Sequence, residues 1–210
     1  KIAVNLWYDK EAREAAQFYV SAFKGSRIMR ATTLDNTPSG AIDLLSIDIA
    51  GHEFTLMSAG PLFKINPSIS FFVECASADE VDARWEKLSD GGTALMELGA
   101  YPFSERYGWL QDRYGVSWQV IYVRDRQIDQ PIVPSLLFVG AQYGNAEAAI
   151  KLYTSVFPHA RIVAIDRYGK GEAPDKEGAV KYGRFVLAGQ HFVAMESAYD
   201  HNFAFNEAVS

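Results

Sequence analysis

The clearest pattern of apolar and polar positions is an amphipathic helix that occurs twice. It reads "EAREAAQFYVSAFKGSRI" at residues 11–28 and "NAEAAIKLYTSVFPHARI" at residues 145–162, an offset of 134 residues. In each copy, five apolar residues recur at the spacing of one helix face. The two stripes are Ala12, Ala15, Ala16, Tyr19 and Phe23, and Ala146, Ala149, Ile150, Tyr153 and Phe157. We therefore predict two equivalent helices, each packed against a sheet through small residues.

Short apolar segments extend this repeat on both sides. Two of these segments precede the helices: "VNLWYD" (4–9) and "PSLLFV" (134–139). Two others follow the helices and open with a turn glycine: "GHEFTLMSAG" (51–60) and "GQHFVAMESA" (189–198). Two more extended segments lie between helix and turn, clearest where Leu45, Ile47 and Ile49 alternate with polar residues. Each repeat is thus predicted to be a module of strand, helix, strand, strand and strand.

Residues 68–123 show the same order with different residues. "SISFFVECA" predicts a strand, and the following helix starts with Ser77 and Glu80 in the spacing of a capping box and ends at Gly91 and Gly92. After this helix we expect a loop, and then two strands around a turn at residues 112–115. This segment is therefore a second module.

The modules suggest an incomplete pair of domains. We expect a complete two-module domain at 1–123, a charged, proline-containing linker at 124–131, and the first half of a second domain at 132–210. The closing "FAFNEAVS" resembles "FKINPSIS" at 63–70, which runs on into the second module. Either further residues follow Ser210 in the natural protein, as a first residue Lys1 instead of Met also suggests, or two chains pair their third modules in a homodimer.

Composition narrows the possible partners. Apolar residues make up 49% and charged residues 22%, as in a folded protein, and the formal charge of −6 argues against nucleic acid and anionic membrane as partners. The single cysteine, Cys75, cannot form an internal disulfide, and no apolar stretch reaches the length of a membrane-spanning helix. We expect a cytoplasmic protein whose partner is a small molecule.

Several motifs in order resemble one known family. They are the strand and helix with "AAQFYVSAF", then "GHEFTLM", "FKINPSISF", a capped helix ending "LSDGG", and "GWLQDRYGVSWQV". Together they are similar to the PhnB-like family of the vicinal-oxygen-chelate, or glyoxalase/dioxygenase, superfamily, whose members are often labelled 3-demethylubiquinone-9 3-methyltransferase. The resemblance implies an α+β fold in which paired βαβββ modules form a cup-shaped mixed sheet that holds the site.

Alternation along the strands expected to line this cup sorts their residues into two faces. One set should form the core against the helices: Val4, Leu6, Tyr8, Phe54, Leu56, Ile69, Phe71, Val73, Val116, Trp118 and Val120. With Trp109, the opposite face supplies the ligand-binding residues that we predict: Asn5, Trp7, Thr55, Met57, Ser68, Ser70, Phe72, Trp109, Ser117 and Gln119. The aromatic members form either a wall for a planar ligand or core packing.

The resemblance also implies positions for metal ligands. In this register they hold Asn5, Met57, Ser68 and Gln119, and the third module offers Ser135, Met195 and Ala208. A first-row divalent metal prefers imidazole, carboxylate or thiolate, which none of these side chains provides. We therefore expect no metal and no cofactor.

Two other segments have a chemical and a structural interpretation. Asp112 is a candidate acid or base, but "QDRYG" between two strands is more typical of a turn in which the Asp accepts hydrogen bonds from the backbone. The glycine-rich "YGKGEAPDKEG" (168–178) leads into no helix, so a hairpin connection is favoured over a Rossmann-type cofactor loop.

The leading hypothesis is a metal-free small-molecule-binding protein, with Asn5, Ser68, Ser70 and Gln119 as polar contacts. The alternative is a metal-dependent lyase, isomerase or dioxygenase of the same superfamily. Methyl transfer comes third, because only the family label suggests it. Scattered histidines at 52, 159, 191 and 201 are typical of a solvated surface.

Overall fold

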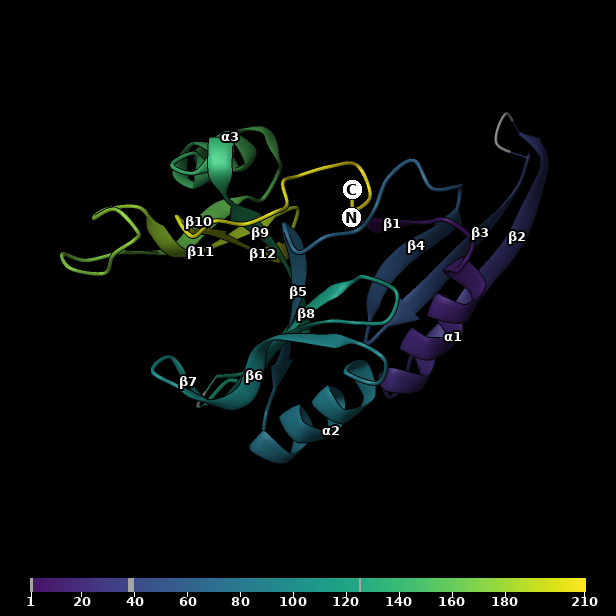
Figure 1. The fold of residues 1–210 in the computed structure, drawn as a ribbon, viewed down its shortest axis with the longest axis horizontal. Helices are drawn as coiled ribbons and strands as arrows, with labels where there is room; N and C mark the ends of the chain where they lie inside the picture. The colour runs from purple at the N-terminus through teal and green to yellow at the C-terminus, as the bar shows by residue number, and fades with distance from the viewer. Residues whose placement is uncertain (1, 38–39, 125) are drawn as a thin grey trace. The chain divides into compact units, whose positions relative to one another are not determined.

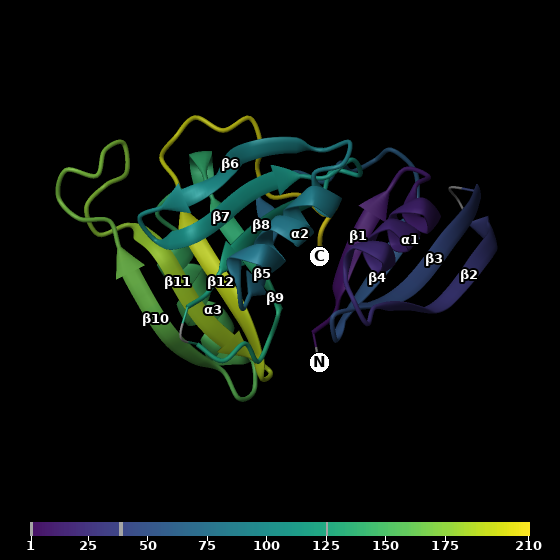
Figure 2. The same ribbon diagram turned by 90° about the horizontal axis from the view of Figure 1, so that it is seen from below.

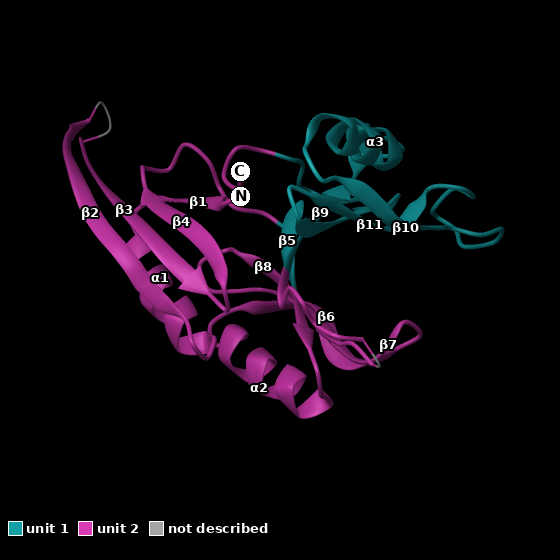
Figure 3. Cartoon of the chain, turned by 180° about the vertical axis from the view of Figure 1, so that it is seen from behind, with its two compact units in different colours: residues 1–2, 67–72, 133–205 teal, residues 3–66, 73–132, 206–210 magenta. Residues whose placement is uncertain are grey.

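The computed structural model describes residues 2–37, 40–124 and 126–210, and divides the chain into two compact units. Unit 1 comprises residues 1–2, 67–72 and 133–205, and unit 2 comprises residues 3–66, 73–132 and 206–210; Figure 3 shows them in teal and magenta. The described elements occur as three successive modules of one strand, one helix and three strands. This order confirms the predicted α+β architecture of repeated modules. The predicted domain boundaries stay a prediction.

The first module lies in unit 2 and forms a four-stranded sheet of order β1-β4-β3-β2. Its elements are β1 (Val4–Tyr8), α1 (Ala12–Ala22), β2 (Arg27–Thr37), β3 (Gly40–Ile49) and β4 (His52–Ser58). β1 runs parallel to β4, and the other pairs are antiparallel. The helix α1 lies along β3 and β4 (Figure 1) and buries the predicted small residues of its stripe together with Tyr19.

Most of the second module, from residue 73 onward, also belongs to unit 2, whereas residues 69–72 of its first strand belong to unit 1. Its elements are β5 (Ile69–Cys75), α2 (Ala78–Leu88), β6 (Thr93–Tyr101), β7 (Ser104–Gln111) and β8 (Ser117–Tyr122), with strand order β5-β8-β7-β6. The predicted cap of α2 is confirmed, since the Glu80 amide donates to Ser77 Oγ over 3.1 Å. The prediction of a loop after Gly92 is wrong, because β6 starts at Thr93 and pairs antiparallel with β7.

The third module lies in unit 1. Its elements are β9 (Ile132–Phe138), the short 3-10 turn Gly140–Gln142, α3 (Ala146–Val156), β10 (Arg161–Arg167), β11 (Val180–Leu187) and β12 (Gln190–Glu196). The strands lie side by side in the order β10-β11-β12-β9 (Figure 2), and residues 69–72 of β5 follow β9. Ala146 and Ile150 of α3 pack against Phe185 and Ala194 of this sheet.

The burial predicted for the core set of strand residues is confirmed, with two exceptions. All the residues predicted to form the core are buried except Val4 and Ile69, which are half-buried. In unit 2 the core centres on the indole of Trp118, whose ring centroid lies 5.6 Å from that of Tyr19 and 5.5 Å from that of Phe23. Phe157, the last residue of the second helical stripe, is 39% exposed, so its predicted burial is wrong.

The last described residues of unit 2 extend the first sheet. The Trp7 amide donates to the Ala208 carbonyl over 2.8 Å, and Asn5 and Ser210 exchange two backbone hydrogen bonds. Asn206 Nδ2 also donates to the Lys64 carbonyl, over 2.9 Å. The segment 206–210 therefore covers the edge of β1 and braces the loop that follows β4.

Candidate functional site

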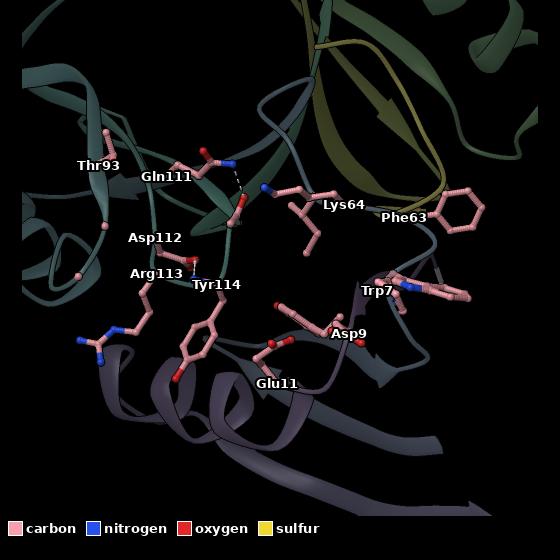
Figure 4. Close-up of a pocket in the computed structure, with 16 residues that line it drawn as sticks. Trp7, Asp9, Glu11, Phe63, Lys64, Thr93, Gln111, Asp112, Arg113 and Tyr114 are labelled. Atoms are coloured by element: carbon pink, nitrogen blue, oxygen red, sulfur yellow. Dashed lines mark hydrogen bonds between the residues drawn. The ribbon is translucent and has the colours of Figure 1, made fainter. Parts of the chain in front are cut away.

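A cavity of about 520 Å³ lies in unit 2, where four loops meet (Figure 4). The lining comes from the end of β1 and the loop after it (residues 7–11), and from the loop after β4 (61–65). It also includes the turn from α2 into β6 (91–93) and the end of β7 with the turn to β8 (111–115). One contact between loops needs a glycine: a Cβ on Gly92 would come within 2.6 Å of the Gln111 carbonyl oxygen. The close approach of the α2 loop to β7 therefore depends on the absence of a side chain at residue 92.

Asp112 forms the base of the cavity and is only 4% exposed. Its Oδ1 accepts hydrogen bonds from the amides of Tyr114 (2.8 Å) and Val116 (3.0 Å), and its Oδ2 accepts one from Trp118 Nε1 (2.8 Å). These contacts confirm the interpretation of "QDRYG" as a turn in which the Asp satisfies the backbone. The same carboxylate also lines the cavity, so its structural role does not remove it from the site.

A buried hydrogen-bond chain joins Asp112 to another wall residue. The Tyr19 hydroxyl interacts with the Asp112 carboxyl and lies 3.1 Å from the Tyr8 hydroxyl, and Tyr8 itself lines the cavity. Burial raises the pKa of the Asp112 carboxyl to about 6, although the hydrogen bonds from Trp118, Tyr114, Tyr19 and Val116 oppose this rise. Burial also raises the pKa of both tyrosine hydroxyls well above their usual value, with a smaller effect from Asp112. Both tyrosines are therefore neutral near pH 7.

The apolar walls are held by specific contacts. Trp7 Nε1 donates to the Gly60 carbonyl over 2.7 Å, and the Trp7 and Phe63 rings meet edge to face with centroids 5.2 Å apart. The Tyr114 ring meets the ring of Phe18 of α1 at 5.5 Å. These contacts fix the aromatic side chains before any ligand is present, which lowers the entropy lost on binding.

The charged side chains of the wall differ in whether a neighbouring residue already neutralises them. Arg113 points away from the cavity in Figure 4; it forms an ion pair with Asp90, and its guanidinium lies 5.1 Å from the centre of the Phe18 ring. Asp9 and Glu11 lie beyond the end of β1, and Lys64 lies on the loop after β4. Since Asp90 compensates Arg113, the lining carries three carboxyl groups against the single ammonium of Lys64.

The structure distributes the predicted ligand-binding residues over three places. Asn5, Trp7, Thr55 and Met57 share one face of β1 and β4, because Asn5 pairs with Thr55 and Trp7 with Met57. Of the ten, Trp7 is the one that lines the cavity. Ligand binding by the other nine stays a prediction.

The remaining six lie in the second module. Trp109 Nε1 donates to Ser117 Oγ over 2.7 Å, and the Tyr107 hydroxyl donates to Gln119 Oε1 over 2.7 Å. Ser68, Ser70 and Phe72 belong to unit 1, where all three are buried. The protein itself thus already supplies hydrogen-bond partners for Ser117 and Gln119.

The superfamily's metal does not fit the residues at the expected positions. Asn5 Nδ2 is directed at the Ser210 carbonyl at 3.5 Å, Gln119 Oε1 accepts from Tyr107, and Met57 offers a thioether. Within residues 2–37, 40–124 and 126–210, no three His, Cys, Asp or Glu side chains are grouped closely enough to hold a metal ion. The expectation of a metal-free protein stays a prediction, but this donor set is unsuited to a first-row divalent ion.

Sequence reasoning missed the loop residues of the cavity, namely Asp9, Glu11, Phe63, Lys64 and Tyr114. One signal was available: acidic residues follow directly after the first strand in "WYDKE", at the end of a buried segment. The glycine-rich segment was interpreted correctly, since residues 168–178 connect the antiparallel strands β10 and β11. No helix in the described part of the chain is both long and apolar enough to cross a membrane.

Comparison with known proteins identifies a family and a relative of known structure. The model of a family described as 3-demethylubiquinone-9 3-methyltransferase matches residues 1–121 and 130–210. A PhnB protein from Bacillus cereus is 36% identical over 59% of this chain and 99% of its own length, with a TM-score of 0.55. No curated protein matches the chain.

A more distant structural neighbour supports the fold alone. Glyoxalase I from Zea mays is 14% identical, with a TM-score of 0.61, over 91% of this chain and 65% of the maize chain. This likeness confirms that the successive modules are those of a glyoxalase-like fold. It carries no information about the ligand, since the sequences have diverged so far.

Proposed function

Since the chain belongs to the 3-demethylubiquinone-9 3-methyltransferase family, with the PhnB-like variant of the glyoxalase fold, we propose that it is a small-molecule-binding protein without the superfamily's metal site. The ligand occupies the cavity above Asp112 in unit 2. The observation that carries this proposal is the cavity itself, whose aromatic walls are fixed and whose rim is charged.

The size and lining of the cavity favour a small organic ligand. A volume of about 520 Å³ lies within the range of pockets that bind metabolite-sized molecules. Trp7, Phe63 and Tyr114 offer flat apolar surface, while Asp9 and Glu11 offer hydrogen-bond acceptors. A molecule with a ring and at least one donor group matches this combination.

The charge of the lining favours a cationic ligand. Figure 4 shows Glu11 beside the Tyr114 ring, with Asp9 close by and Lys64 on the other side of the cavity. Carboxylates and aromatic faces both attract an ammonium group, whereas an anion would meet repulsion from Asp9, Glu11 and the ionised fraction of Asp112. We therefore place a protonated amine next to Glu11 and Asp9, with its apolar part against the aromatic walls.

Methyl transfer, which the family description names, is not part of the proposal. A Rossmann-type methyltransferase binds its cofactor at a glycine-rich turn between a strand and a helix. In this chain the segment 168–178 instead joins two antiparallel strands.

Three probes of similar size and different charge test the proposal: benzylamine, benzyl alcohol and benzoate. The proposal predicts saturable binding of benzylamine, measured by isothermal titration calorimetry, with weaker binding of the alcohol and the weakest binding of benzoate. The Tyr114→Ala and Glu11→Gln variants should each weaken benzylamine binding about tenfold, as expected for the loss of an aromatic or charged contact. Asp35→Asn, at an exposed residue of β2, is the control. Equal affinity for all three probes, or unchanged affinity in both variants, would overturn the proposal.

A further inference from the structure

The cavity above Asp112 carries opposite charges on two of its walls. Asp9 and Glu11 supply carboxylates from the segment after β1, and Lys64 supplies an ammonium group from the loop after β4. Figure 4 shows Lys64 on the side of the cavity that faces Asp9 and Glu11. The two kinds of charge therefore lie across the same space from each other.

The protein itself does not pair these charges. Within residues 2–37, 40–124 and 126–210, no ion pair joins Asp9, Glu11 or Lys64 to another side chain. The Lys10 amide donates to Glu11 Oε2 over 2.9 Å, which holds that carboxylate at the start of α1. Arg113 differs, because Asp90 already neutralises it. A ligand with charges of both signs would thus form ion pairs on both walls at once.

The loop that carries Lys64 is anchored on both sides of this residue. The Phe63 ring meets the Trp7 ring edge to face, and Ile65 is only 4% exposed. Asn206 Nδ2 donates to the carbonyl of Lys64 itself, over 2.9 Å. The backbone of Lys64 is therefore fixed, and the position of its ammonium depends only on the rotamers of its own side chain.

The positions of the charges decide which kind of zwitterion fits. An α-amino acid carries its ammonium and its carboxylate on one carbon, so it cannot place them on opposite walls. A ligand that reaches both walls needs a ring or a chain between its two charges. The aromatic side chains of Trp7, Phe63 and Tyr114 line the same cavity and offer apolar contact to such a body.

We propose that the ligand of this cavity is an ω-amino acid, a zwitterion whose ammonium and carboxylate are separated by an apolar body. The inference rests on the proposed function, to which it adds an anionic group at the far end of the cationic ligand. The ammonium binds Asp9 and Glu11, the apolar body lies against the aromatic walls, and the carboxylate binds Lys64 Nζ. Lys64 is then the residue that selects zwitterions over simple amines.

Two matched derivatives of benzylamine test this inference, namely 4-(aminomethyl)benzoate and its neutral amide, 4-(aminomethyl)benzamide. Isothermal titration calorimetry at pH 7 should show about two- to fivefold tighter binding of the benzoate, as expected for one exposed ion pair. Lys64→Met keeps the apolar stem and should make the two affinities equal, and Lys64→Glu should reverse their order. Lys24→Met, at an exposed residue outside the cavity, is the control and should keep the preference.

A third probe, 4-methylbenzoate, separates this inference from the proposed function. It lacks the ammonium and should bind more weakly than both amines, because Asp9 and Glu11 repel an anion. If it binds as tightly as 4-(aminomethyl)benzoate, or if neither amine binds saturably, the proposed function fails and the inference fails with it. If both amines bind saturably with equal affinity, or if Lys64→Met keeps the preference for the zwitterion, the inference alone is overturned and the cationic site stands.

Discussion

The Asp112 carboxylate accepts a hydrogen bond from the indole of Trp118 over 2.8 Å, which ties the base of the cavity to the largest side chain of the unit 2 core. The same carboxylate accepts hydrogen bonds from the Tyr114 and Val116 amides of the β7–β8 turn and interacts with the hydroxyl of Tyr19 in α1. Cavity shape and core packing in unit 2 are therefore coupled through a single acidic residue.

The first prediction concerns the pH dependence of stability. Burial raises the Asp112 pKa from 3.8 to about 6, so the folded protein binds this proton more tightly than the unfolded chain does. The stabilisation from this proton is complete below pH 3.8 and is lost as the pH rises through 6, with a total on the order of 2–3 kcal/mol. In Asp112→Asn this contribution should vanish. Urea denaturation between pH 4 and pH 7 measures this contribution. If the free energy of unfolding changed with pH in the same way in both proteins, the raised pKa of Asp112 would be refuted.

The second prediction concerns the start of α2. Ser77→Ala should lower the free energy of unfolding by about 1 kcal/mol, because the Glu80 amide loses the Ser77 Oγ acceptor. Ser155→Ala is a matched control, since that hydroxyl donates to the Leu152 carbonyl within α3 and caps no helix start. Equal effects of the two substitutions on urea denaturation would show that the cap does not contribute.

The third prediction concerns the packing of α2 on β7. A Cβ on Gly108 would come within 2.3 Å of the Trp85 ring, whereas one on Gly99 of β6 would meet nothing closer than 3.9 Å. Gly108→Ala should therefore cost about 1–3 kcal/mol of stability by overpacking, and Gly99→Ala much less. The double variant Gly108→Ala with Trp85→Leu should recover part of the loss, because the smaller side chain leaves room. Additive losses in urea denaturation would contradict this steric explanation.

Strong periodic patterns made the modules predictable from the sequence. The stripe of Ala12, Ala15, Ala16 and Tyr19 fits α1, and both hairpin glycines were placed correctly. β6 was missed because its residues alternate between exposed and half-buried positions, which weakens the apolar signal. Phe23 and Phe157 both follow their helices in extended conformation, yet only Phe23 is buried, against Trp118. Periodicity could not tell them apart, since this contact comes from a distant segment.

The cavity was harder to predict for a physical reason. Most of its residues lie on loops after β1, β4 and α2 and in the β7–β8 turn, and no short-range pattern shows that these loops meet. Strand alternation instead directed attention to side chains such as Ser117 and Gln119, which the protein itself hydrogen-bonds. The expected homodimer stays a prediction that the mass in solution can test.

The most direct test of the proposed function is the mapping of bound benzylamine by amide chemical shifts. The account predicts saturable changes at residues 7–11, 61–65, 91–93 and 111–115, the four segments that line the cavity. Asp9→Asn should weaken these changes, and the amides of unit 1 should stay unaffected. The absence of saturable changes, or changes centred on residues outside these four segments, would contradict the claim that this cavity binds the ligand.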